Sequence, residues 1–221
     1  RLGGGSVPLA LPPTAVPQMH RYGIDPTRID VILISHLHAD HAFGLPFLLL
    51  EYCVRYERKE PLTLVGPPGI RELSESSCCV AWPDMREAGF HPRVPLVYRE
   101  ARAGASLEAA GIPIEAVPMN HFGLAAFGYR FTVDGKRFAY TGDTGNFDGL
   151  RDFLADVDVA IVELTHPAPK NDPGHLDVDA VRRLAASLQA RGTRVFATHL
   201  SARPKPVEGV TLLDDGGLYY V

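Results

Sequence analysis

The residues best suited to chemistry stand close together early in the chain. Three histidines and one aspartate fall within a single short run, His36-Leu37-His38-Ala39-Asp40-His41. Imidazole and carboxylate groups are the usual ligands of Zn(II) and similar divalent metals. In a tight loop, alternate residues His36 and His38 can point to one metal, whereas Asp40 and His41 fall past the bend and can point to a second. We therefore predict a metal site and regard a merely histidine-rich polar turn as the weaker alternative.

Three further candidate ligands follow other predicted strands. His121 comes after a strand at 112–117, Asp143 after one at 136–140, and His199 after one at 194–198. One loop cannot complete two metal sites, because each zinc takes about four ligands. Each of these residues alone has an ordinary structural explanation. Their shared position at strand ends predicts that they join the same site.

The elements expected to position these residues alternate between strands and helices. A β-branched apolar run at 30–35 predicts a buried strand directly before the His36 loop. Apolar residues at helical spacing predict helices at 43–59 and 178–190, and Asp134-Gly135 is a strong hairpin signal. The remaining predicted strands are 62–65, 94–100, 112–117, 127–133, 136–140, 157–163, 194–198 and 218–221. This pattern is typical of an α/β domain with helices covering packed sheets.

Composition excludes several function classes. The 221 residues carry a net charge of −4, so no basic excess indicates a large nucleic-acid partner. No apolar run approaches the length of a membrane span. The three cysteines, two of them adjacent, do not form a disulfide framework. We expect a cytoplasmic protein with no membrane attachment.

Four motifs together resemble the metallo-β-lactamase superfamily. They are His-Leu-His-Ala-Asp-His at 36–41, Asn-His-Phe at 120–122, Tyr-Thr-Gly-Asp-Thr-Gly at 140–145 and Ala-Thr-His-Leu at 197–200. The resemblance implies a four-layer αββα sandwich with a dinuclear site, most simply two Zn(II), with Mn or Fe as alternatives. It implies that the first metal is held by His36, His38 and His121, the second by Asp40, His41 and His199, and that Asp143 bridges them together with a hydroxide.

Within this superfamily the chain resembles the branch of ribonuclease Z and related phosphodiesterases. It lacks the Thr-Pro-Gly-His-Thr type of turn found in glyoxalase, lactonase and true β-lactamase members. The resemblance implies that His175 assists catalysis as a general acid and that Asp40 orients the nucleophile. Glu163, at the end of a predicted strand, is a candidate partner that orients a ligand histidine. Asp177 is the expected N-cap of the helix at 178–190.

One departure from ribonuclease Z concerns the substrate. That enzyme carries a long tRNA-gripping insertion where this chain has the tight hairpin 127–140. We therefore expect a small molecule or a short nucleotide as substrate and no large nucleic acid. The apolar helix at 43–56 is a possible homodimer interface, although packing on its own sheet is the favoured explanation.

The resulting functional prediction is a dinuclear metal-dependent hydrolase, phosphodiesterase in type. The bridging hydroxide would attack a small or single-stranded phosphodiester. The metal ligands alone do not separate this activity from hydrolysis of a carboxylic ester, lactone or thioester. A metal-stabilised binding protein without catalysis is a third possibility.

The beginning of the chain departs from the family pattern. Residues 1–22 are rich in glycine and proline, and the expected first strands of the fold are apparently missing or truncated there. We otherwise expect a single metallo-β-lactamase-like domain over residues 1–221.

Overall fold

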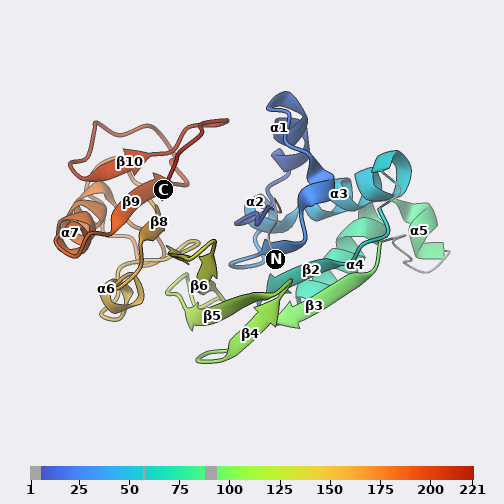
Figure 1. The fold of residues 1–221 in the computed structure, drawn as a ribbon, viewed down its shortest axis with the longest axis horizontal. Helices are drawn as coiled ribbons and strands as arrows, with labels where there is room; N and C mark the ends of the chain where they lie inside the picture. Colours follow the sequence, from blue (N-terminus) through green and yellow to red (C-terminus); the bar gives the residue numbers. More distant parts are fainter. Residues whose placement is uncertain (1–5, 57, 88–93) are drawn as a thin grey trace. The chain divides into compact units, whose positions relative to one another are not determined.

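The computed structural model describes residues 6–56, 58–87 and 94–221. The chain divides into two compact units. The first comprises Arg1–Arg102 with Leu107–Gly111, and the second comprises Ala103–Ser106 with Ile112–Val221. In Figure 1 the colour of the ribbon separates them, with blue to green for the first and mainly green to red for the second.

The first unit is built on a parallel sheet with strand order β1-β2-β3. Its strands are β1 (Val31–Leu33), β2 (Leu62–Gly66) and β3 (Leu96–Glu100). Every residue of β1 and β2 is buried, as expected for parallel strands covered by helices. The helical elements are α1 (Ala15–Arg21), η1 (Pro26–Arg28), α2 (Ala39–Ala42), α3 (Leu45–Glu51), η2 (Tyr52–Tyr56), α4 (Ile70–Ala81) and α5 (Pro83–Glu87).

The core of the first unit forms between its helices and its sheet. Ile32, Leu45, Leu48 and Ile70 are fully buried within one apolar cluster. Because α3 and β1 contribute to the same cluster, the apolar face of this helix packs on its own unit, as the sequence favours. This core holds the carboxyl end of β1 in place, which is where the His36 loop begins.

The second unit is built on a mixed sheet. Its strand order runs β10-β9-β8-β7-β6-β5 and continues to β4 (Ser106–Ala109), whose residues are divided between the units. Strands β7 to β10 are parallel, and β5, β6 and β7 pair antiparallel. The strands are β5 (Ile112–Pro118), β6 (Phe127–Val133), β7 (Lys136–Tyr140), β8 (Val159–Glu163), β9 (Arg194–Thr198) and β10 (Val210–Leu212).

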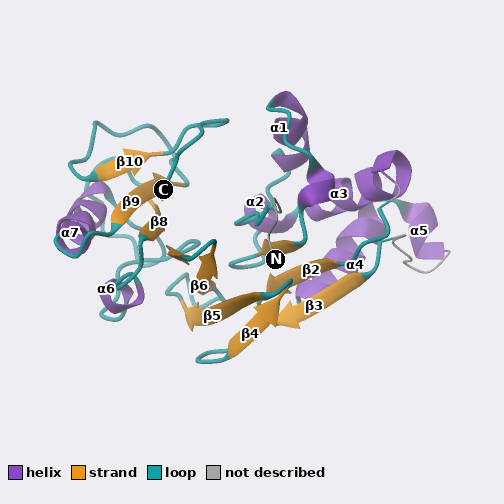
Figure 2. Cartoon of the chain, in the orientation of Figure 1, coloured by secondary structure: helices purple, strands orange, loops and turns teal. Residues whose placement is uncertain are grey.

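Two helices belong to the second unit, α6 (Leu150–Phe153) and α7 (Val178–Gln189), among the residues described (Figure 2). The side chain of Asp177 accepts a hydrogen bond from the Ala180 N–H at 2.8 Å, which confirms the predicted N-cap. The buried face of α7, including Val181 and Leu188, joins the same apolar cluster as Ala160 of β8. Strand β8 is thereby fixed between neighbouring strands and a helix.

Most predicted elements are present, with two corrections. The predicted helix at 43–59 instead divides into α3 and the π-helical turn η2, which ends at Tyr56. The buried guanidinium of Arg58 donates hydrogen bonds to the carbonyl oxygens of Thr27 and Pro61 and to the Asp30 carboxylate. These contacts direct the chain away from the helix axis.

The predicted strand at 218–221 is wrong. The edge strand beside β9 is β10, and residues 218–221 form no strand. Leu218 and Tyr220 are 84% and 85% exposed, so these two side chains are not buried against a sheet. Among the described residues, no helix combines the length and hydropathy that crossing a membrane requires.

Candidate active site

The His36 loop belongs to the first unit and begins at the carboxyl end of β1. His36 and His41 are buried, with 0% and 3% exposure, and their rings lie 4.2 Å apart between centroids. The Ser35 hydroxyl lies 3.1 Å from Nδ1 of His36 and 3.5 Å from Nδ1 of His41. A partner at Nδ1 favours Nε2 as the nitrogen that each ring offers to a metal.

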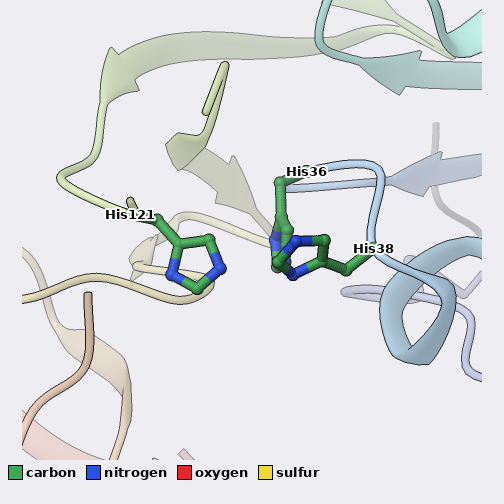
Figure 3. A group of neighbouring side chains, drawn as sticks. All are labelled: His36, His38 and His121. Atoms are coloured by element: carbon green, nitrogen blue, oxygen red, sulfur yellow. The ribbon is translucent and has the colours of Figure 1, made fainter. Parts of the chain in front are cut away.

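His38 and Asp40 complete the polar groups of this loop. His38 occupies the N-cap position of α2, and its ring centroid lies 4.6 Å from that of His36. Figure 3 shows the side chains of these two histidines close to each other. The Asp40 carboxylate is 64% exposed and lies 3.6 Å from Nε2 of His41. Within this unit the predicted ligands of the motif therefore gather on one short segment.

Asp143 of the second unit lies in the turn after β7 and is 3% exposed. Gly142 before it has φ +58°, a conformation that favours glycine. A Cβ at Gly145 would lie 2.0 Å from the Pro173 carbonyl oxygen, so only glycine allows this turn to approach the segment that carries His175. The glycines on both sides of Asp143 thus permit the tight path of this turn.

A buried carboxylate, Glu163, organises the second unit's polar groups from the end of β8. Glu163 is 1% exposed, and its Oε1 accepts a hydrogen bond from the Thr144 N–H at 3.0 Å. Its Oε2 accepts from the Thr165 N–H at 2.9 Å and lies 2.7 Å from the Thr165 hydroxyl. Because an ionised carboxylate only accepts, the Thr165 hydroxyl must donate to it.

The network of Glu163 fixes the orientation of His199. Nδ1 of His199 lies 2.8 Å from the Thr165 hydroxyl, whose proton is already donated to Glu163, so Nδ1–H of the ring donates to this oxygen. Nε2 of His199 is then the nitrogen suited to metal binding, and it lies 3.4 Å from Oδ2 of Asp143. His199 has φ +57°, a costly conformation for a residue with a side chain, as found at functional sites.

His121 is oriented in the same way by the backbone. Its Nδ1 lies 2.9 Å from the carbonyl oxygen of Gly174, an acceptor, so Nδ1–H donates and Nε2 is the nitrogen suited to metal binding. The ring is 1% exposed.

His175 contacts the same buried carboxylate. Its Nδ1 lies 2.9 Å from Oε1 of Glu163 and 3.9 Å from Oδ2 of Asp143. The hydrogen bond with Glu163 raises the pKa of His175, and the negative charges of Glu163 and Asp143 act in the same direction against the opposing effect of burial. Nδ1–H of His175 therefore faces the Glu163 carboxylate, and Nε2 is the ring nitrogen suited to proton transfer.

The donor groups of the second unit fit a divalent metal. One ligand atom each from His121, Asp143 and His175 lie within 4.8 Å of one another, as do one each from Glu163, His175 and His199. Imidazole nitrogen and carboxylate oxygen, without thiolate, are the ligands that zinc, manganese and iron share. The chemistry of these residues thus suits the predicted metals.

Two functional residues escaped the sequence reasoning, Thr165 and Gly174. Thr165 connects Glu163 to His199, and Gly174 supplies the carbonyl oxygen that binds His121. Their roles arise from the path of the chain between β8 and α7, and no local sequence motif predicts them.

The other histidines lie outside the proposed ligand sets. His20 lies 3.2 Å from Glu51, and His166 lies 2.9 Å from Asp172. His91 lies outside the described residues.

A family comparison agrees with these motifs. The model of the β-lactamase superfamily domain matches residues 9–200. The chain belongs to this family. Ribonuclease BN of Escherichia coli O157:H7 is 29% identical over 243 aligned residues, which cover 84% of this chain and 75% of that protein. Since the aligned region is longer than the whole chain, the relative carries residues that this chain lacks.

Two solved structures show the same fold. The metallo-β-lactamase fold protein YhfI of Bacillus subtilis has a TM-score of 0.72 and 18% identity, covering 97% of this chain and 86% of its own. The short form of human tRNase Z has a TM-score of 0.73 and 22% identity, covering 98% and 88%. The predicted metallo-β-lactamase fold, an α/β architecture, is therefore confirmed.

Proposed function

We propose that this protein is a metal-dependent phosphodiesterase acting on a small or single-stranded phosphodiester. The observation that carries the proposal is the Glu163 network, which places His175 beside Asp143 and His199 in the second unit. Family membership and a ribonuclease relative support hydrolysis of a phosphodiester. The absence of basic excess, at a net charge of −4, supports a small substrate.

The metals in this proposal are two divalent ions, Zn(II) in the simplest case. One would be held by His36, His38 and His121, and the other by Asp40, His41 and His199, with Asp143 as a further ligand. The donor chemistry of each unit supports this assignment. When bound, such ions lower the pKa of water and neutralise charge that develops on the phosphate.

The chain's own residues have separate tasks. Glu163 holds Nδ1–H of His175, so that Nε2 is the atom that donates a proton to the leaving oxygen. Asp40, whose carboxylate is exposed, accepts a hydrogen bond from the attacking group and orients it. A cavity of about 390 Å³ in the second unit lies beside His175. Its lining includes the cationic side chains of Lys170 and Arg183, which can bind a phosphate group, together with the carboxylates of Asp172 and Asp177.

The test compares two variants with different expected defects. His36→Ala removes a buried ligand and should abolish both metal loading and hydrolysis of bis-p-nitrophenyl phosphate. His175→Ala should retain metal, measured by elemental analysis, while kcat falls by about 10²–10⁴. Unchanged turnover by metal-loaded His175→Ala protein would remove His175 from the mechanism.

The same assay separates the phosphodiesterase from its alternatives. Turnover of p-nitrophenyl acetate or a lactone, with no turnover of the phosphodiester, would make the protein a carboxylic ester hydrolase. A chain that binds metal but hydrolyses neither substrate class would be a metal-stabilised binding protein.

A further inference from the structure

A phenylalanine occupies a turn position that rarely accepts one. Phe122 has φ +46° and Gly123 has φ +74°, and the Leu124 N–H donates to the His121 carbonyl oxygen at 2.9 Å. These values describe a tight turn whose central residues both lie in the left-handed region, where glycine, asparagine and aspartate are preferred. A bulky residue there is unfavourable and persists where the surroundings hold it and a function needs it.

The surroundings of Phe122 do hold its ring. A Cβ added at Gly174 would lie 2.4–2.7 Å from three atoms at the far end of the phenyl ring, so glycine at this position makes room for it. The ring centroid lies 4.9 Å from that of His121 and 5.5 Å from that of His175. Phe122 is therefore placed against a proposed metal ligand and the proposed proton donor.

The same ring remains open to a ligand. Phe122 is 55% exposed although it is large and apolar. The two histidine rings meet it at interplanar angles of 56° and 71°, so neither is stacked on it. An exposed aromatic ring beside a reaction centre is the arrangement on which nucleobases stack in single-stranded nucleic-acid sites.

We propose that Phe122 is a specificity-determining residue that stacks on a nucleobase or similar aromatic group of the substrate. This inference rests on the proposed phosphodiesterase function and names the class of its substrate: a phosphodiester that carries a base next to the bond that is cleaved. The stack would orient the scissile phosphate relative to His175.

The test uses two matched substrates and two matched ligands with the metal-loaded protein. The substrates are a thymidine dinucleotide and the same dinucleotide without its bases, followed by chromatography. The ligands are thymidine 5′-monophosphate and 2-deoxyribose 5-phosphate, followed by calorimetry, which needs no turnover. Wild-type protein should prefer the base-containing member of each pair by about tenfold, the usual contribution of one stacked base.

Phe122→Asn is the decisive variant, because asparagine suits the turn and removes only the ring. It should lose the preference in both assays, and Phe122→Trp should keep it. Tyr220→Asn, which removes another exposed aromatic ring outside the site, should behave as wild type. An Asn variant that retains the preference, or that loses activity equally on both substrates, would overturn the inference. Equal cleavage of both dinucleotides by wild type would overturn it as well, whereas cleavage of neither would instead reject the proposed function.

Discussion

At the scale of single residues, Glu163 connects several polar groups of the candidate site in the second unit. Its carboxylate is buried and connects to Thr144, Thr165 and His175. In Glu163→Gln the amide keeps the size of the side chain but supplies one acceptor oxygen instead of two. We expect metal affinity or kcat to fall about 10–100-fold, as for other residues that orient ligands.

The measurement for this variant is a metal titration together with steady-state kinetics. Glu108→Gln provides a matched control, because Glu108 carries the same carboxylate on an exposed position of β4. If Glu163→Gln had the kinetics and the metal affinity of wild type, the hydrogen bonds of Glu163 would have no part in orienting His175 and His199.

The lowered pKa of Asp172 leads us to expect that the stability of the fold depends on pH. The pKa of Asp172 is lowered, first by the hydrogen bond from the Gly174 N–H and further by His166 and the charge of His175. A carboxylate with a lowered pKa stabilises the fold above its unfolded pKa of about 3.9, and this stabilisation is lost as pH falls through the folded value. Lys170 also faces this group, at 3.6 Å.

The corresponding variant is Asp172→Asn, measured by Tm between pH 7 and pH 2.5. The variant should melt below wild type at pH 7, and the difference should shrink at the acid end of the series. A constant difference across the series would show that the carboxylate charge does not contribute.

At the scale of elements, the hairpin between β6 and β7 shows how local chemistry determines structure. Asp134 has φ +50° and Gly135 has φ +77°, as expected for a two-residue hairpin turn. A Cβ at Gly135 meets nothing within 4 Å, so Gly135→Ala tests conformation alone. We expect a loss of about 1–2 kcal/mol in unfolding free energy. Asp134→Asn, which suits the turn, is the control, and an Ala variant as stable as wild type would contradict the argument.

The interface of α7 with its sheet tests packing. Leu188 is 1% exposed within the apolar cluster of the second unit, so Leu188→Ala should cost about 2–5 kcal/mol in a urea titration. Arg182→Ala changes the exposed face of the same helix and should cost far less, within about 0.5 kcal/mol. Equal effects of the two variants would show that the helix does not depend on its buried face.

These elements also show why sequence predicts some features and not others. Strands β6, β7 and β9 and helix α7 carry clear apolar periodicity and turn signals, and their bounds were predicted within a residue. Residues 218–221 have strand-like composition, but they form no strand, and the side chains of Leu218 and Tyr220 are exposed. The candidate ligand histidines could be chosen from the sequence because they occur in short motifs, and their role as metal ligands stays a prediction. Thr165 and Gly174 act only because the chain between β8 and α7 returns to the strand ends, which no short motif encodes.

At the scale of the whole molecule, each of the two units contributes residues to the proposed set of metal ligands. His36, His38, Asp40 and His41 belong to the first unit, and His121, Asp143 and His199 belong to the second. A ligand that binds only the folded chain raises its stability, by about 2.7 kcal/mol at a hundredfold excess over Kd. Removal of a proposed ligand from either unit should therefore reduce this gain.

The decisive experiment measures Tm with and without zinc for His36→Ala, Asp143→Ala and wild type. Wild type should melt higher with zinc, and both variants should lose most of the shift although their substitutions lie in different units. His20→Ala is the control, because His20 pairs with Glu51 and belongs to neither proposed ligand set. If one ligand variant kept the full shift, the substituted residue would hold no metal, and it would have to be removed from its proposed ligand set.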